Sequence, residues 1–396
     1  MINETLKASP LFNLSLSSKE LFHSNFLYWL GTQYPGLFVE VCKEIGCKAD
    51  WADSTWEIKR EHNNFDLCVI NSEKEKDVKL VLENKVKSIP KKSQLDEYQK
   101  KAGNDVQDLI LLSLVTDFPD RKSIEAEARW KIKSYTDLHD AILKYKNQFV
   151  NDSYHSALID DYCRFVKCLH ELSKSWMVQD EHTFLLSDSD KKESKALRVG
   201  DLQDKIWYSQ LIIKLNTQLQ ELKPIKVTSN IDINGIREKG RCLDEVFTNW
   251  GFTHSQGLLE AKIRIDKDYV LLIQLQGDKY CHGIEWLTSG RHNELWKQTQ
   301  NINLVKELGF LKFSEGTKEM FPSICQDTPI TIRVKGKKET ETRIYNKYGN
   351  TFLYQYKKIK PDATVAEVIT AIKNEVEQII DKARELSIRL YNCQSV

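Results

Sequence analysis

Residues 65–86 constrain this chain most, because they hold two apolar, β-branched runs separated by one short charged segment. The runs are 65–70 and 78–86, and the charged segment is 71–77. Such runs are typical of β-strands, and a short polar connection joins consecutive strands as an antiparallel hairpin. The sequence therefore predicts a hairpin in which Asp66 stands at the start of the first strand.

Glu83 and Lys85 point the same way from the second predicted strand, because side chains alternate between the two faces of a strand. Asp66 is then expected opposite the end of that strand. Two carboxylates and a nearby lysine can hold a hard divalent cation and leave room for water and a phosphate, which favours Mg²⁺ with Mn²⁺ as a substitute. The set predicts phosphodiester hydrolysis, with Asp66 and Glu83 as metal ligands and Lys85 orienting the water or offsetting phosphate charge. The alternative is a salt bridge between Glu83 and Lys85 on a solvated sheet face.

Asp66, sixteen intervening residues and then Glu83-Asn84-Lys85 resemble the signature of the PD-(D/E)XK nuclease superfamily, with Phe65 where its proline would stand. That proline is often absent in the family. The resemblance covers roughly residues 10–145 and implies a nuclease domain of the α/β class, in which helices flank a central mixed sheet. The order of the predicted helices and strands favours the same α/β sandwich.

Gln94 and Tyr98 lie one helical turn apart in the segment SQLDEYQKKA. This spacing resembles the Gln-x-x-x-Tyr element of the RecB-like and lambda-exonuclease-like branch of the superfamily. The resemblance implies that the pair lies beside the metal site and contacts the substrate strand.

The predicted amphipathic helix 18–31 resembles the first core helix of the family, where an acidic residue completes the metal shell. Glu20 is the matching residue and a candidate third metal ligand, and His23 is a candidate nucleic-acid contact one turn further on. The alternative is that Glu20 complements the positive end of the helix and forms a capping box with Ser17. The sequence leaves both interpretations open.

Lysines are concentrated beside the predicted site, although the net charge of the chain is only +1. Lys87, Lys91 and Lys92 are the candidates for phosphate contacts, which carry no sequence information. For the lysines that follow Lys92, a solvated helix face is an equal alternative. The full set between residues 79 and 101 is Lys79, Lys85, Lys87, Lys91, Lys92, Lys100 and Lys101.

Other Glu-x-Lys motifs compete with the predicted site, among them Glu57-x-Lys59 and Glu260-x-Lys262. The second is the more serious competitor, because Asp244 precedes it by a similar interval. The segment around Asp244 shows no strand alternation in the sequence, which favours the N-terminal motif.

The length of 396 residues favours two domains. We expect a nuclease-like domain at 1–177, a polar linker at 178–200, and an α+β domain at 201–396. The elements expected in the second domain are helices at 201–222, 293–308 and 364–390 and strands at 260–265, 269–276 and 280–286. Its role would be recognition of the substrate, of a protein partner, or of a second copy in a homo-oligomer.

Composition is that of an ordinary soluble protein, with 41% hydrophobic and 29% charged residues and no apolar run long enough to cross a membrane. The N-terminal segment lacks the pattern of a signal peptide, so a cytoplasmic location is expected. The nine cysteines include no Cys-x-x-Cys pair, which argues against a disulfide framework and a zinc ribbon.

The favoured hypothesis is an Mg²⁺-dependent nuclease acting on DNA. One alternative is a catalytically silent nuclease-like module that binds nucleic acid or protein, although such modules have usually lost one of the Asp, Glu and Lys residues. Another alternative is an RNA-directed nuclease. The family resemblance suggests a bacterial or phage setting, such as defence against invading DNA.

Overall fold

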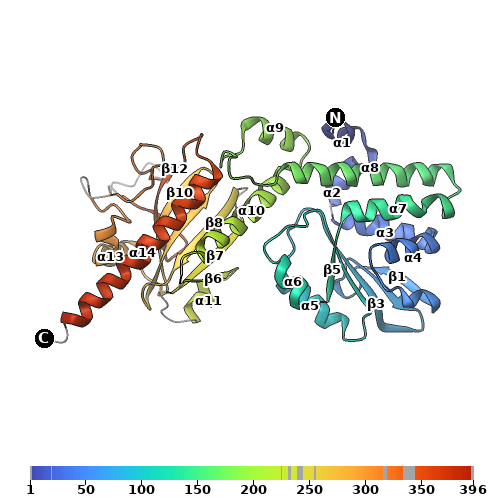
Figure 1. The fold of residues 1–396 in the computed structure, drawn as a ribbon, viewed down its shortest axis with the longest axis horizontal. Coiled ribbons are helices and arrows are strands. Elements are labelled where there is room, and N and C mark those ends of the chain that lie inside the picture. The colour runs from blue at the N-terminus through green and yellow to red at the C-terminus, as the bar shows by residue number, and fades with distance from the viewer. Residues whose placement is uncertain are drawn as a thin grey trace. The chain divides into compact units, whose positions relative to one another are not determined.

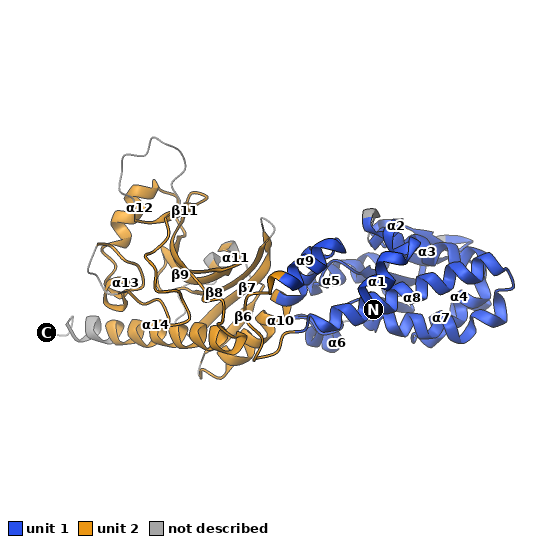
Figure 2. Cartoon of the chain, turned by 90° about the horizontal axis from the view of Figure 1, so that it is seen from above, with its two compact units in different colours: residues 1–177, 189–207 blue, residues 178–188, 208–396 orange. Residues whose placement is uncertain are grey.

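The chain divides into two compact units, each of which is described by itself (Figure 2). Unit 1 comprises residues 1–177 and 189–207, and unit 2 comprises 178–188 and 208–396. The expected linker 178–200 is thus shared between the two units. The charged segment Asp188–Ala196 of that linker forms helix α9, in which Ser194 is buried. The sequence of this helix has no apolar stripe.

The computed structural model describes most of the chain, and the statements below apply to that part. The described residues are 2–18, 20–127, 129–223, 225–230, 233–238, 244–253, 256–314, 319–332 and 344–393. None of the described helices combines the length and the apolar composition of a membrane span.

Unit 1 is built on a mixed sheet with the strand order β1-β2-β3-β4-β5. The first three strands pair antiparallel, and β3, β4 and β5 pair parallel. Strand β4 is buried along its whole length, as the apolar sequence of a central parallel strand requires. The strands are β1 (Trp56–Arg60), β2 (Leu67–Asn71), β3 (Lys74–Lys85), β4 (Asp108–Ser113) and β5 (Trp130–Ser134).

Helices flank this sheet in two groups (Figure 1). Helices α5 (Lys92–Ala102) and α6 (Arg121–Glu127) make the crossovers between the parallel strands and contact each other. The second group packs together through α3–α4, α4–α7 and α7–α8 contacts. The expected α/β sandwich with a central mixed sheet is therefore confirmed. The remaining helices of unit 1 are α1 (Ile2–Ala8), α2 (Pro10–Ser18), α3 (Glu20–Gln33), α4 (Pro35–Glu44), α7 (Tyr135–Phe149) and α8 (Ser153–Ser175).

Unit 2 is an α+β unit with a seven-stranded sheet in the order β11-β12-β10-β9-β8-β7-β6. All neighbours pair antiparallel except β6 and β7. Helix α14 (Val365–Cys393) covers one face, where Glu375 accepts a hydrogen bond of 2.6 Å from Tyr280. The strands are β6 (Lys226–Ser229), β7 (Glu245–Thr253), β8 (Gln256–Ile263), β9 (Tyr269–Gln276), β10 (Lys279–Trp286), β11 (Asn346–Tyr348) and β12 (Phe352–Lys358).

Two expectations for unit 2 were wrong. The helix expected at 293–308 is divided into α12 (His292–Thr299) and α13 (Asn303–Leu308), because Ile302 takes extended backbone angles between them. The segment after Asp244 is strand β7, although the sequence alternation there is weak. Its first four residues are all buried, which hides the alternating pattern of a half-exposed strand. The other helices of unit 2 are α11 (Ile233–Glu238) and the part of α10 (Gly200–Gln220) from residue 208 onward.

Candidate active site

The β2–β3 hairpin brings Asp66 to Glu83. Leu67 pairs with Leu82 in the antiparallel register, so Asp66, one residue earlier, lies opposite Glu83. The backbone N–H of Asn84 donates a hydrogen bond of 2.8 Å to Asp66 Oδ2 and fixes that carboxylate at the hairpin end. The expected position of Asp66 opposite the end of the second strand is confirmed.

Glu83 and Lys85 form an ion pair with 2.7 Å between Glu83 Oε1 and Lys85 Nζ. Only 2% of the Glu83 side chain and 7% of the Lys85 side chain are exposed. The pair is therefore not the solvated surface salt bridge of the alternative interpretation. Desolvation of two buried charges offsets most of their attraction, so stability alone does not account for the pair.

The electrostatics of the site are dominated by burial and by crowded carboxylates. Burial, followed by the charge of Asp66, raises the pKa of Glu83 to about 7. Burial also raises the pKa of Asp66, and the Asn84 N–H and Lys85 oppose that rise. Burial alone would lower the pKa of Lys85, but Glu83, Glu20 and Asp66 together raise it. Two neighbouring carboxylates repel each other when both are ionised. A cation bound between them offsets that repulsion and favours their charged forms.

The donor set of Asp66 and Glu83 fits a hard divalent cation. Glu83 Oε2 is buried and has no hydrogen-bond partner among the described residues, so this oxygen is available as a ligand. Mg²⁺ keeps several of its waters and takes one or two protein carboxylates, which suits a pair of this kind. Within the described residues, however, no three His, Cys, Asp or Glu side chains converge closely enough to hold a metal by themselves.

Glu20 begins helix α3 and faces the loop that follows β3. Its Oε1 accepts hydrogen bonds from the Ser88 hydroxyl at 2.6 Å, the Ser88 N–H at 3.1 Å and the Lys87 N–H at 3.3 Å. Its charge also raises the pKa of Asp66, after burial. Ser17 belongs to helix α2, and its side chain lies outside the described part of the structure. Glu20 therefore stands near the two carboxylates, with one oxygen bonded to the loop.

Gln94 and Tyr98 lie on helix α5, as expected, and Gln94 Nε2 donates a hydrogen bond of 2.8 Å to the Tyr98 hydroxyl. The Tyr98 ring meets the Phe65 ring edge to face with 5.9 Å between the centroids. Because Phe65 directly precedes Asp66, the Gln-x-x-x-Tyr pair is anchored beside the hairpin end.

Comparison with known families matches residues 37–164 to the model described as the PD-(D/E)XK nuclease superfamily. Unit 1 belongs to the PD-(D/E)XK nuclease superfamily. The match is to the superfamily as a whole, so the RecB-like and lambda-exonuclease-like branch stays a prediction. The matched segment ends before the second range of unit 1 and does not reach unit 2. No curated protein and no solved structure matches the chain.

His23 was expected to contact nucleic acid, and this expectation was wrong. The residue is 1% exposed, and its Nδ1 lies 3.1 Å from the Tyr162 hydroxyl. Burial lowers the pKa of His23 to about 3, so the ring is neutral. His23 is a core residue of the PD-(D/E)XK unit, packed against the rings of Tyr135 and Phe165.

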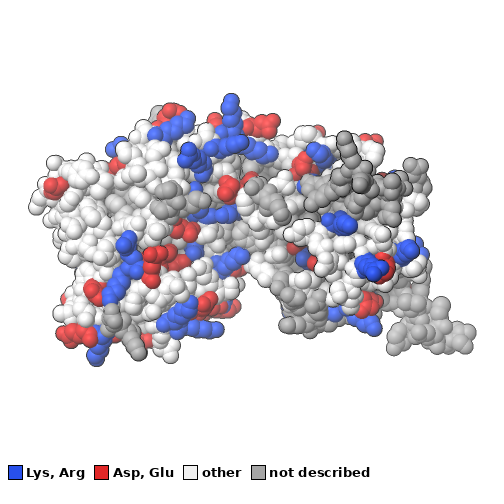
Figure 3. All heavy atoms as spheres, turned by 180° about the vertical axis from the view of Figure 1, so that it is seen from behind, with Lys and Arg blue, Asp and Glu red and all other residues white. Residues whose placement is uncertain are grey.

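The lysines between residues 79 and 101 of the PD-(D/E)XK unit are partly neutralised by acidic neighbours. Lys92 pairs with Asp96 at 2.7 Å and with Glu127 at 3.3 Å, which reduces its value as a phosphate contact. Lys87 Nζ donates to the Arg198 carbonyl at 3.4 Å, and Lys91 is exposed. Basic and acidic side chains are interspersed on the face drawn in Figure 3.

The amide of Asn84 was not singled out from the sequence, although it ties the signature strand to two helices. Asn84 Nδ2 donates to Ser24 Oγ at 2.9 Å, and the Tyr135 hydroxyl donates to Asn84 Oδ1 at 3.1 Å. A fully buried amide needs such partners. The signal available in the sequence was a polar residue at an inward position of an apolar strand.

The competing Glu260-x-Lys262 motif lacks the geometry of the PD-(D/E)XK signature. Glu260 and Lys262 also form a buried ion pair, with 3.1 Å between Oε2 and Nζ. However, the strand partner of Glu260 is Asn249, five residues along the chain from Asp244. Asp244 pairs instead with Arg384. The structure thus brings an aspartate opposite the motif glutamate in unit 1 and not in unit 2.

Proposed function

We propose that this chain is an Mg²⁺-dependent nuclease that hydrolyses phosphodiester bonds in DNA. The observation that carries the proposal is the set of half-buried Asp66 with buried Glu83 and Lys85 at the hairpin end of a PD-(D/E)XK unit. Asp66 and Glu83 would hold the Mg²⁺ ion, and Mn²⁺ would substitute for it. The bound ion would supply Lewis-acid stabilisation of the phosphoryl group and a water of lowered pKa.

Lys85 would act on the reacting groups directly. Its ammonium carries a positive charge and three donors, and Glu83 Oε1 holds it in place at 2.7 Å. In this position it would orient the attacking water or offset the charge that grows on the phosphate. The buried setting strengthens either interaction, because water does not screen it.

The remaining site residues would position the substrate. Gln94 and Tyr98, joined by their hydrogen bond, would contact the strand beside the scissile phosphate, as in the RecB-like branch. Lys87 and Lys91 would bind phosphates of the backbone, with Lys92 a weaker candidate because of its ion pairs. Unit 2 would select the substrate or a partner, in a cytoplasmic, bacterial or phage defence setting.

A cleavage assay with the full chain tests this function. Plasmid, linear duplex DNA, single-stranded DNA and RNA are each incubated with Mg²⁺ and with a chelator. Cleavage of DNA that requires Mg²⁺ is the expected result. Cleavage of RNA alone would replace DNA with RNA as the substrate, and binding without cleavage under all conditions would indicate a catalytically silent module.

A further inference from the structure

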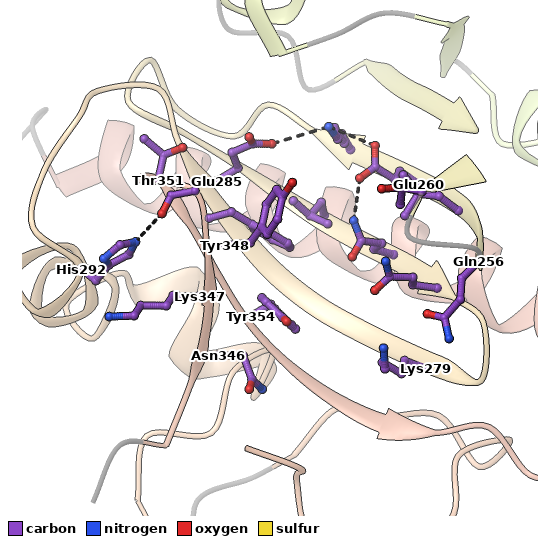
Figure 4. Close-up of a pocket in the computed structure, with 18 residues that line it drawn as sticks. Gln256, Glu260, Lys279, Glu285, His292, Asn346, Lys347, Tyr348, Thr351 and Tyr354 are labelled. Carbon is purple, nitrogen blue, oxygen red and sulfur yellow. Dashed lines mark hydrogen bonds and ion pairs between the residues drawn. The ribbon is translucent and has the colours of Figure 1, made fainter. Parts of the chain in front are cut away.

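Unit 2 carries a hollow of about 950 Å³ on one face of its sheet (Figure 4). Residues of strands β7 to β12 line it. Tyr280 and His282 of β10 reach Glu375 of helix α14 on one face of the sheet. Lys279 and Glu285 have the opposite parity on β10 and line the hollow, which therefore lies on the face away from α14. Its volume is near the upper end of small-molecule sites, which span roughly 300–1,000 Å³.

Glu260, Lys262 and Glu285 lie together on the floor of the hollow. Lys262 Nζ lies 3.1 Å from Glu260 and 3.5 Å from Glu285, and these three side chains are 8%, 9% and 19% exposed. Gln274 Nε2 donates to Glu260 Oε1 at 2.7 Å and holds that carboxylate in place. Each ionised carboxylate oxygen can accept up to two hydrogen bonds, so the floor offers acceptor oxygens to an N–H donor of a ligand.

Aromatic rings form one wall of the hollow. The rings of Phe352 and Tyr354 are stacked with their centroids 5.0 Å apart and their planes 16° apart, and the Tyr356 ring continues the series. Gly283 on the neighbouring strand allows this arrangement, since a Cβ there would lie 2.3 Å from the Phe352 ring. Tyr354 is partly exposed and offers a flat surface to a planar ligand.

Basic side chains complete the lining. Lys279 Nζ stands 5.7 Å from the centroid of the Tyr356 ring, and Lys347 on β11 is exposed. Figure 4 shows the two lysines on either side of Tyr354. The hollow thus offers a π surface, acceptor oxygens and two ammonium groups.

We propose that this hollow binds an unpaired nucleotide. The base would stack on Tyr354, its N–H edge would meet Glu260 and Glu285, and its phosphate would meet Lys279 or Lys347. A simple anion would be repelled by the carboxylates, and a simple cation would be repelled by the lysines. A nucleotide has N–H donors for the carboxylates and a phosphate for the lysines. The base edges of a duplex are already paired, so a duplex would not fit. A free nucleotide and a nucleotide within a single strand share this chemistry, and neither source depends on the cleavage chemistry of unit 1.

Binding is measured by fluorescence polarisation on the full chain carrying Asp66→Ala, with a chelator present to prevent cleavage. The probes are labelled single-stranded oligonucleotides of DNA and RNA, with unlabelled mononucleotides and a duplex as competitors. We expect the single strand to bind and the duplex to compete poorly. Competition by mononucleotides would assign the free nucleotide as a ligand, and competition by oligonucleotides alone would assign the strand.

Variants locate the binding. Tyr354→Ala should weaken it about tenfold, because one stacked base is lost, and Tyr354→Phe should retain it. Lys347→Glu alters an exposed residue, so it should fold normally and weaken binding with a smaller dependence on salt. Tyr154→Ala, at a tyrosine that is 70% exposed on α8, is the matched control.

Binding that is unchanged in both Tyr354→Ala and Lys347→Glu would place the strand elsewhere and overturn the proposal, as would failure of every probe to bind. Either failure would leave Mg²⁺-dependent cleavage untouched. Conversely, absence of cleavage in the substrate assay would leave the polarisation result intact, so the two proposals can fail separately.

Discussion

Asn84 donates its backbone N–H to the Asp66 carboxylate at 2.8 Å, while its side chain is bonded to Ser24 and Tyr135. A single residue therefore fixes a candidate metal ligand and also joins β3 to helices α3 and α7. Rigid support of this kind is what a site needs to hold reacting groups in position.

Asn84→Ala should destabilise unit 1 while leaving the Asp66 contact in place, since that contact comes from the backbone. The change leaves the Ser24 and Tyr135 hydroxyls buried without this partner, and we expect the free energy of unfolding to fall by about 1–3 kcal/mol. Chemical denaturation followed by circular dichroism measures it. The exposed Asn151→Ala is the control, and equal stability of the two variants would contradict the structural role of the amide.

Lys85→Ala should lower the cleavage rate by on the order of a hundredfold or more, as loss of one electrostatic stabiliser commonly does. Lys59→Ala is a matched control, because Lys59 also pairs with a glutamate two residues earlier, at 2.8 Å, in the same sheet. Single-turnover kinetics at saturating enzyme separate the rate from binding. Equal rates for the two variants would remove Lys85 from the reaction.

Glu20→Gln should weaken Mg²⁺ binding while thermal stability holds. The amide keeps an acceptor oxygen for Ser88 but removes the charge that acts on Asp66 and Glu83. Isothermal titration with Mg²⁺ and a thermal melt of the same preparation measure the two effects. The exposed Glu97→Gln on α5 is the control. Wild-type affinity and activity in Glu20→Gln would limit this residue to holding the loop after β3.

His23 should reduce stability in acid. Burial lowers its pKa from 6.5 to about 3 in the folded chain, so the unfolded chain binds an additional proton between these values. The contribution to stability is fully present above about pH 6.5 and is lost as the pH falls toward 3. In NMR titrations the ring signal, identified with His23→Gln, should not shift as the pH passes 6.5. A midpoint at the ordinary histidine value would show that the ring is solvated.

The hairpin and its three charged residues could be predicted because they depend on local properties. Alternation places Glu83 and Lys85 on one face, and a short turn places Asp66 opposite. The surroundings of His23 depend on Tyr162, which lies far away in the chain, and no local pattern reports that contact. Burial on the inside of a helix layer therefore could not be distinguished from exposure beside the site.

The same limit applies to the second unit. The lining of the hollow comes from strands distant in sequence, and only the register brings Gln274 to Glu260 and Tyr354 to Gly283. Helix α9 could not be recognised because its sequence is polar all round. The presence of an α+β unit was nevertheless predictable from its apolar strands.

The most direct test compares the cleavage rates of the wild-type chain, Asp66→Ala and Glu83→Ala. It decides whether these two carboxylates carry the activity. Asp66→Ala should keep its fold, because removing one of two facing carboxylates relieves repulsion between like charges. Glu83→Ala also removes the ion-pair partner of the buried Lys85 and should be less stable, so circular dichroism checks that it is folded under the assay conditions. We expect both to lose Mg²⁺-dependent cleavage and to bind Mg²⁺ or Mn²⁺ more weakly, while the exposed Asp53→Ala behaves as wild type. Cleavage by a folded Asp66→Ala variant at close to the wild-type rate would contradict the assignment of the site.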